Sequence, residues 1–266
     1  MKVFKKTFIV TGGANGMGRE LVIKLLQKGA RVAAVDLDEK ALESLQKEHV
    51  IYKDSLKTYV LNISNLDDVL SFKEQVLTDF KEVEGLINVA GIIQPFIKID
   101  ELEYDAIKRV MDVNFYGTLY MVKTFLPELL EKDEAHIINF SSMGGFLPVP
   151  GQAIYGASKA AVRLMTEALY AELKETNVKV TLVFPGAVKT NIAKHSLKDA
   201  PDMESEESNY KMLSAEKAAS LTIKAIESNK LYVYYGSDSR FMNKLYRLMP
   251  KGATNMIAKK MGGLLK

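Results

Sequence analysis

The sequence contains no cysteine, and its 266 residues include only three histidines. Without cysteine the chain forms no disulfide, no thiolate metal site and no cysteine nucleophile. The histidines, His49, His136 and His195, lie far apart, and none has a neighbour at the spacing of a metal ligand. We therefore expect no metal site, and we expect a cytoplasmic protein, with which the lack of disulfides is compatible.

Long apolar runs are also missing. No stretch reaches the roughly 20 residues that a membrane-spanning helix needs, and residues 1–10 lead into an expected strand without the pattern of a signal peptide. Hydrophobic residues make up 47% of the chain and charged residues 26%, which is typical of a globular protein. The length suits one large α/β domain or two small ones.

Short apolar segments alternate with longer amphipathic ones along most of the chain. This alternation predicts β-α-β units, and therefore a doubly wound α/β fold whose parallel sheet of about seven strands has helices on both faces. Gly117 and Pro127 interrupt one long helical segment, which leaves its ends open. The expected strands cover residues 7–11, 31–36, 57–61, 85–89, 135–141, 179–184 and 231–235, and the expected helices cover 18–28, 39–47, 66–80, roughly 100–131, 153–175 and 215–228.

Residues 187–212 depart from this alternation. The segment is polar, contains Pro201 and carries an acidic cluster that includes Asp202, Glu204 and Glu206. Long connections of this kind are often functional. Two interpretations remain open, a lid over the functional site and a solvated surface loop.

A glycine-rich loop joins the first expected strand to the first expected helix, with the sequence Thr-Gly-Gly-Ala-Asn-Gly-Met-Gly at residues 11–18. Glycines let backbone amides approach a pyrophosphate, and the N-terminus of the following helix favours its negative charge. The second expected strand ends in Asp36, where a carboxylate can bind the adenosine ribose hydroxyls and repel a 2′-phosphate. Because Leu37 and Asn15 supply no compensating positive charge, the sequence favours NAD over NADP.

Tyr155 and Lys159 lie four residues apart in an expected helix and therefore share one face of it. A free tyrosine has a pKa of about 10 and is a poor base at neutral pH. A neighbouring ammonium group lowers that pKa, so the pair is a candidate acid/base device. The alternative is an ordinary pair on a solvated helix.

Taken together and in this order, the motifs resemble those of the short-chain dehydrogenase/reductase family. The resemblance extends from Lys6 to about Gly236, and it implies a Rossmann-type catalytic domain at residues 1–239 and an NAD(P)-dependent oxidoreductase acting on CH–OH groups. The motifs that carry it are Thr-Gly-x-x-x-Gly-x-Gly at 11–18, Asn88-Val89-Ala90-Gly91, Asn114, Ser141-Ser142, Tyr155-x-x-x-Lys159, and Pro185-Gly186 followed by Thr190.

The resemblance implies a catalytic set of four residues. Tyr155 would exchange a proton with the substrate oxygen while hydride moves at the nicotinamide, and Lys159 would lower the pKa of Tyr155 and hold the nicotinamide ribose. Ser142 would hydrogen-bond the substrate oxygen, and Ser141 would be structural. Asn114 would hold a water that links Lys159 to solvent, or would bond to backbone, and these two roles are compatible.

The resemblance also implies the cofactor contacts. Val188 and Thr190 would hold the carboxamide, and Asn62, which stands where the family often has aspartate, would accept a hydrogen bond from the adenine amino group. The full implied set is Gly12, Asn15, Gly16, Met17, Gly18, Asp36, Leu37, Asn62, Ile63, Asn88, Ala90, Gly91, Tyr155, Lys159, Pro185, Gly186, Val188 and Thr190.

A substrate pocket follows from the same resemblance. Its expected lining is mostly apolar and contains no Arg or Lys, which favours an apolar secondary alcohol or ketone over a sugar phosphate. Some of these residues can instead pack the surrounding loop. The expected lining residues are Met143, Gly144, Phe146, Leu147, Val149 and Gln152, with Gln94 and Phe96 opposite and residues 187–212 above.

Residues 240–266 form a basic amphipathic extension. They carry a net charge of +7, and because the whole chain carries +3, residues 1–239 carry −4. Apolar residues recur there at helical spacing, beginning with Phe241, Leu245 and Leu248 and resuming at Ile257 and beyond. We rank packing within the molecule or against another subunit first and peripheral contact with an anionic membrane second, and we expect no nucleic-acid binding.

Three functions remain open at this point. The leading one is hydride transfer between NAD(H) and an apolar secondary alcohol or ketone by a Ser-Tyr-Lys-Asn set. The second is an NADPH-dependent ketoreductase of the 3-oxoacyl type, and the third is a non-catalytic dinucleotide-sensing or scaffold protein. The resemblance also implies a homodimer or homotetramer.

Overall fold

A computed structural model describes residues 1–186 and 213–264, so the predicted lid at 187–212 and the last two residues lie outside the described part. Seven parallel strands form one sheet in the order β3-β2-β1-β4-β5-β6-β7, which confirms the predicted α/β fold. The strands are β1 (Thr7–Thr11), β2 (Arg31–Asp36), β3 (Leu56–Val60), β4 (Gly85–Asn88), β5 (Ala135–Phe140), β6 (Val178–Phe184) and β7 (Tyr232–Tyr234).

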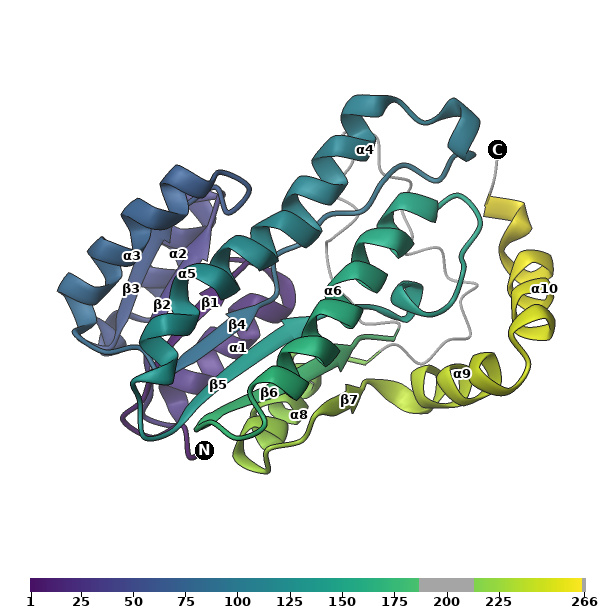
Figure 1. Ribbon diagram of the computed structural model, residues 1–266. Coiled ribbons are helices and arrows are strands. Elements are labelled where there is room, and N and C mark those ends of the chain that lie inside the picture. Colours follow the sequence, from purple (N-terminus) through teal and green to yellow (C-terminus); the bar gives the residue numbers. More distant parts are fainter. Residues whose placement is uncertain (187–212, 265–266) are drawn as a thin grey trace.

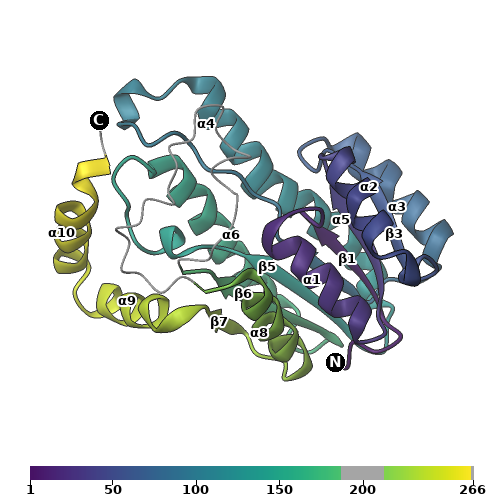
Figure 2. The same ribbon diagram turned by 180° about the vertical axis from the view of Figure 1, so that it is seen from behind.

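Helices cover both faces of this sheet (Figures 1 and 2). One core cluster joins the sheet to α1, α2 and α8, and a second joins the opposite face to α3, α5 and α6. The helices are α1 (Gly16–Gln27), α2 (Glu39–Glu48), α3 (Leu66–Phe80), α4 (Tyr104–Met111), α5 (Thr118–Leu130), α6 (Ala153–Glu172), α8 (Ala215–Glu227), α9 (Gly236–Leu248) and α10 (Pro250–Met261).

The long helical segment after β4 differs from the prediction that Gly117 and Pro127 interrupt it. A π-helical turn at Asp112–Gly117 joins α4 to α5 without a break, and Pro127 lies inside α5. Gly117 allows Ile63 to pack closely on this turn, because a Cβ there would lie 2.8 Å from the Ile63 side chain. The wider π turn carries Asn114, which is fully buried.

The C-terminal helices pack on the body of the protein beyond β7 (Figure 1, yellow). Helix α9 begins at Gly236, before the boundary at 240 expected from the sequence. A third core cluster joins Met242, Ala253 and Ile257 of these helices to Phe146 and Phe184 of the body. The extension therefore contributes to the buried core.

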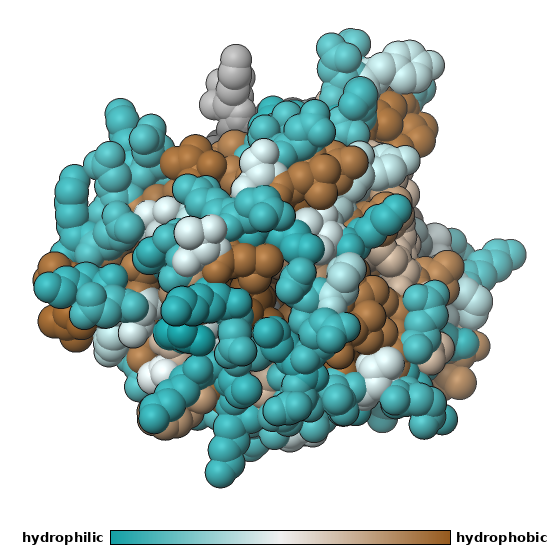
Figure 3. Space-filling model, turned by 60° about the vertical axis from the view of Figure 1, so that its left-hand side comes forward, coloured by the Kyte–Doolittle hydropathy of each residue, from teal (hydrophilic) through white to brown (hydrophobic). Residues whose placement is uncertain are grey.

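The surface in Figure 3 is dominated by hydrophilic side chains, with apolar ones in separate groups between them. Among the described residues, no helix has both the length and the apolar character needed to cross a membrane.

Candidate active site

The glycine-rich loop follows β1 and turns sharply into α1. Gly12 and Gly16 adopt φ angles of 68° and 52°, which side-chain-bearing residues rarely adopt. A Cβ on Gly18 would lie 1.9 Å from the carbonyl oxygen of Gly12, so the start of α1 can pack on the loop only with glycine at this position. The side chain of Asn15 does not cap α1, and its first turn holds no acidic residue, which leaves its N–H groups suited to an anion.

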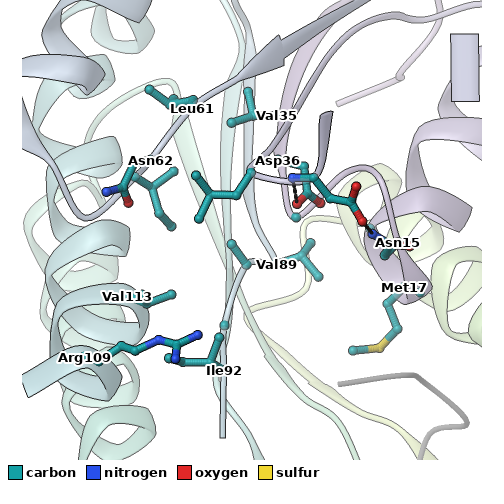
Figure 4. A pocket seen from close by; sticks show the side chains of 18 residues that line it. Asn15, Met17, Val35, Asp36, Leu61, Asn62, Val89, Ile92, Arg109 and Val113 are labelled. Carbon is teal, nitrogen blue, oxygen red and sulfur yellow. Dashed lines mark hydrogen bonds between the residues drawn. The ribbon is translucent and has the colours of Figure 1, made fainter. Parts of the chain in front are cut away.

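The carboxylate of Asp36, at the end of β2, is held by two backbone amides. Its Oδ2 accepts a hydrogen bond from the Ala14 N–H at 3.0 Å, and its Oδ1 accepts one from the Asp38 N–H at 3.2 Å. The Asn15 amide donates to Asp38 Oδ2 at 3.4 Å. These bonds tie the glycine loop to the end of β2, where Asp36 lies beside Asn15 (Figure 4), and they hold a second carboxylate, that of Asp38, at the same place.

A cavity of about 430 Å³ lies between this loop and the carboxyl ends of the strands. It opens where the chain order of the sheet reverses, between β1 and β4, which is the usual ligand position in doubly wound sheets. Eleven of the residues predicted to bind a cofactor line it, namely Gly12, Asn15, Gly16, Met17, Gly18, Asp36, Leu37, Asn62, Ile63, Ala90 and Gly91.

The sequence reasoning missed seven further residues of this lining. Arg109 and Val113 come from α4 and the π turn, which the chain brings over the cavity opposite Asp36 (Figure 4). No local motif identifies Arg109. It faces the cavity only because of its position about one and a half turns after the start of α4. The other five are Val35, Asp38, Leu61, Val89 and Ile92, which lie at strand ends or in the residues directly after them.

Five other predicted cofactor residues lie away from this cavity or outside the described part. Asn88 is buried behind it, where its amide donates to Asn139 Oδ1 at 2.8 Å. Pro185 and Gly186 follow β6, and a Cβ on Gly186 would lie 2.7 Å from a backbone oxygen of the segment before α9. Val188 and Thr190 lie outside the described residues.

Lys159 extends from α6 toward the cavity. Its ammonium donates to the carbonyl of Phe140, at the end of β5, at 3.1 Å. A Cβ on Gly91, which itself lines the cavity, would lie 3.0 Å from Lys159 Nζ and 3.1 Å from Asn114 Oδ1. Burial lowers the pKa of Lys159 to about 8. Two of the four predicted catalytic residues, Lys159 and Asn114, therefore lie next to Gly91 at the edge of the cavity.

Tyr155 and Ser142 lie next to each other at the start of α6. Burial raises the pKa of the Tyr155 phenol, and a hydrogen bond with the Ser142 hydroxyl opposes this rise. The direction differs from the expectation that Lys159 lowers this pKa, because removal of the phenol from water outweighs the other effects in the protein alone. Ser142 Oγ also accepts from the Gly144 N–H at 3.1 Å.

Ser141 has the structural environment that was expected of it. Its hydroxyl donates to the carbonyl of Lys159 at 2.8 Å and so ties the end of β5 to α6. A Cβ on Gly145 would lie 2.5 Å from Ser141 Oγ, which shows how closely the loop after β5 packs on the helix.

Asn114 is bonded to backbone and to one side chain. Its amide nitrogen donates to the Ile92 carbonyl and to Ser158 Oγ, both at 2.9 Å, and its Oδ1 accepts from the Ile92 N–H at 2.8 Å. The Ser158 hydroxyl in turn donates to the Tyr155 carbonyl at 2.7 Å. These contacts match the backbone-bonded alternative, and the water-holding role stays a prediction.

Gln94 and Gln152, predicted to line the substrate pocket, are both buried and hydrogen-bonded to backbone. Gln94 Oε1 accepts from the Ile154 and Tyr155 N–H groups at 2.8 and 2.9 Å, and its Nε2 donates to the Gly151 carbonyl at 3.0 Å. Gln152 Nε2 donates to the Gln94 carbonyl at 2.9 Å. The Gln94 side chain therefore caps the helix that carries Tyr155, a role the sequence reasoning did not assign to it.

The remaining predicted pocket residues, apart from Phe96, lie in a short apolar loop after Ser142. Phe146 and Leu147 are buried in the third core cluster, and Met143 and Val149 pack against it. Phe96 is half-buried in the segment after β4. A Cβ on Gly144 would lie 3.3 Å from the Tyr155 ring, so this loop borders the phenol directly.

Comparisons with known proteins agree with this arrangement. A family model described as short chain dehydrogenase matches residues 6–201. The SadH protein of Mycobacterium tuberculosis, which is named an oxidoreductase, is 31% identical over 260 residues that cover 95% of this chain and 94% of SadH.

Two solved structures are similar in fold as well as in sequence. A short-chain dehydrogenase/reductase of Burkholderia phymatum in complex with NAD has a TM-score of 0.83 and 26% identity, covering 93% of this chain and 96% of that one. A short-chain dehydrogenase of Burkholderia cenocepacia in complex with NADP has a TM-score of 0.80 and 25% identity, covering 97% and 99%. Relatives of this fold therefore bind either dinucleotide.

Proposed function

The chain belongs to the short-chain dehydrogenase/reductase family of oxidoreductases acting on CH–OH groups, and from this membership we propose that it transfers hydride between NAD(H) and an apolar secondary alcohol or ketone. One observation carries the proposal. Gly91 lines the cavity beside the glycine loop, and the buried side chains of Lys159 and Asn114 lie directly next to Gly91. A dinucleotide lying along this cavity would extend from Asp36 to the catalytic set.

The preference for NAD rests on the charges at the end of β2. Asp36 and Asp38 both line the cavity there, and Leu37 between them carries no charge. A 2′-phosphate at this position would meet two carboxylates, whereas ribose hydroxyls could donate hydrogen bonds to them. Arg109, the cation in this lining, lies across the cavity from Asp36 (Figure 4) and forms no ion pair with Asp36 or Asp38.

The proton chemistry is assigned to Tyr155. Its raised pKa keeps the phenol protonated at neutral pH, so it can donate a proton to a ketone oxygen during reduction. Ser142, which is hydrogen-bonded to that phenol, would bind the same oxygen and stabilise its developing charge. Lys159 would hold the ribose beside Gly91, and bound nicotinamide would supply or accept the hydride.

An apolar substrate fits the loop that follows Ser142. Met143 and Val149 of this loop are only half-buried, and they pack against a cluster made entirely of apolar and aromatic side chains. A small apolar alcohol or ketone would gain from contact with such a surface, whereas a phosphate or carboxylate would find no cation among these residues.

Titration of the purified protein with NADH and with NADPH tests the cofactor assignment. We expect NADH to bind at least about tenfold more tightly, a difference of about 1.4 kcal/mol. Asp36→Ala should remove most of this preference, whereas Asp54→Ala, at an exposed position far from the cavity, should retain it. Tighter binding of NADPH by the parent protein would refute the use made of Asp36.

The substrate class is tested by a panel of secondary alcohols and ketones, with NADH absorbance as the readout. We expect turnover to rise with the apolar character of the substituents. Turnover restricted to substrates that carry a phosphate or a carboxylate would contradict the assignment of an apolar pocket.

A further inference from the structure

Helix α9 has an inner face that is fixed firmly to the protein. The Ser239 hydroxyl donates to the Phe184 carbonyl at 3.3 Å, and the Asn243 amide donates to the Tyr234 hydroxyl at 2.9 Å. Met242, between them, is buried in the third core cluster. These contacts set the rotation of α9 about its axis, and therefore which residues point outward.

The residues that point outward are basic and apolar. Arg240, Lys244 and Arg247 are all exposed and recur at intervals of three or four residues, which places them along one side of α9. Lys251, at the start of α10, is exposed as well. The exposed fractions of Phe241, Leu248 and Met249 are 62%, 82% and 59%. We call these seven residues, of which Met249 and Lys251 lie just beyond the end of the helix, the outer face of α9.

The apolar series read from the sequence is thus divided between the two sides. Leu245 and Ile257 of that series pack in or against the third core cluster, together with Met242. Phe241, Leu248 and the adjacent Met249 are exposed instead. The inner face of α9 packs on the protein, as predicted for the extension, whereas the outer face does not. The outer face still needs a separate explanation.

The charges of the outer face have no acidic partner within the described residues. Elsewhere on this surface, Lys24 and Lys28 pair with carboxylates of α8 at 2.7 and 2.9 Å. None of the four basic residues of the outer face makes such a pair with any residue in 1–186 or 213–264. Residues 1–239 carry −4 while residues 240–266 carry +7, so positive charge is concentrated at this end of the chain.

We propose that the outer face of α9 binds an anionic lipid surface, with the helix axis parallel to the membrane plane. Phe241, Leu248 and Met249 would enter the boundary between headgroups and acyl chains, and the surrounding Arg and Lys side chains would contact the anionic headgroups. Both ribbon views place α9 and α10 at one edge of the molecule (Figures 1 and 2), where a flat surface can approach them.

Charge complementarity favours a lipid surface over a second copy of this chain. A two-fold interface brings the same patch of both copies together, so four unpaired cations would face four others. Like charges across an interface cost binding energy, whereas an anionic membrane supplies opposite charge at every position.

Co-sedimentation of the full-length protein with vesicles tests this proposal. We compare vesicles of phosphatidylcholine alone with vesicles that also contain phosphatidylglycerol, each at low and at high salt. We expect binding to the anionic vesicles at low salt, and weaker binding at high salt because salt screens the headgroup charge. Equal binding to both vesicle types would overturn the proposal.

A matched pair of double variants locates the surface. The first double variant, Lys244→Glu with Leu248→Ser, changes the outer face. The control, Lys53→Glu with Ile51→Ser, makes the same kind of change elsewhere on the surface. The apolar residues replaced, Leu248 and Ile51, are both 82% exposed. We expect the first variant to bind anionic vesicles at least about tenfold more weakly than the parent, and the second to bind within about twofold of it.

Two further results would overturn the proposal. The first is unchanged vesicle binding by the Lys244→Glu, Leu248→Ser variant, with its circular dichroism spectrum like that of the parent. The second is a change in the sedimentation coefficient of this variant in lipid-free solution, because that result would identify the outer face as a contact between copies.

Discussion

At the residue scale, Tyr155 is the group whose role can be tested with the smallest change. Replacing it with phenylalanine removes only the hydroxyl that is hydrogen-bonded to Ser142. We expect Tyr155→Phe to lower kcat by about 10²–10⁴, the usual contribution of a positioned proton donor. NADH affinity, measured by titration, should change little, because the ring and the packing around it remain.

The matched control is Tyr170→Phe, which removes a hydroxyl from an exposed tyrosine of the same helix. It should retain the parent kcat. A Tyr155→Phe variant with parental turnover of a good substrate would show that another group transfers the proton.

The lowered pKa of Lys159 leads us to expect that the stability of the protein depends on pH. Burial lowers its pKa from 10.5 to about 8, so the unfolded chain holds this proton at pH values where the folded protein has lost it. Between these two values the unfolded state binds more protons, and raising the pH therefore favours folding through this group. The burial of its charge costs stability below about pH 8, and that cost disappears as the pH rises toward 10.5.

The measurement is a melting temperature across pH 7 to pH 10 for the parent and for Lys159→Met, taken as a difference so that other titrating groups cancel. We expect relief of the buried charge to make the variant more stable by about 1–3 kcal/mol at neutral pH. Loss of the hydrogen bond from Lys159 to the Phe140 carbonyl will reduce this gain. This advantage should shrink as the pH rises. A difference that is constant with pH would contradict a lowered pKa of Lys159.

At the element scale, the start of α6 depends on Gln94, which lies some 60 residues earlier in the chain. Its Oε1 accepts from the N–H groups of Ile154 and Tyr155, so it holds the first turn, which carries the phenol proposed to transfer the proton. Gln94→Leu would leave both groups without a partner in a buried place, at a cost of about 1–3 kcal/mol. We expect a lower melting temperature together with a lower kcat and an unchanged NADH affinity.

The conservative variant Gln94→Glu separates positioning from stability. Its carboxylate can accept both N–H groups and suits the positive end of the helix, although it cannot donate to the Gly151 carbonyl. We expect kcat to recover toward the parent value. If Gln94→Leu lowers the melting temperature and leaves kcat unchanged, Gln94 is a cap without influence on Tyr155.

Elements set by local sequence could be predicted, and those set by contacts across the fold could not. The glycine loop between β1 and α1 is determined by nearby residues, and so are the continuous apolar runs that became buried strands. The π turn that carries Asn114 packs against Ile63 at Gly117, and the capping role of Gln94 depends on a helix that begins 59 residues later. The sequence on either side of these residues contains no pattern that predicts either contact.

At the scale of the whole molecule, the C-terminal helices complete the core behind the proposed substrate loop. Phe146 of that loop packs edge-on against Phe184 at 5.6 Å, and Ile257 and Met242 belong to the same cluster. The sequence indicated helices here, and Leu245 and Ile257 of the predicted apolar series do pack, whereas Phe241 and Leu248 are exposed. Periodicity reveals a stripe of apolar residues and does not show which of them meet the body of the protein. The position of the extension depends on contacts with β6 and the loop after β5.

This arrangement predicts that a cavity made in α10 weakens the entire protein. Ile257→Ala should lower the free energy of unfolding by about 2–4 kcal/mol, because the buried side chain leaves a void between α10 and the body. The neighbouring Met256 is exposed, so Met256→Ala should change stability by less than about 0.5 kcal/mol. Unfolding is followed in urea by circular dichroism, which reports all the helices. If residues 250–261 fold as a separate appendage, Ile257→Ala will leave the main unfolding transition in place and add a small transition at lower urea. We expect a single transition that is shifted to lower urea. The reason is that the third core cluster couples α10 to the central sheet through Phe184.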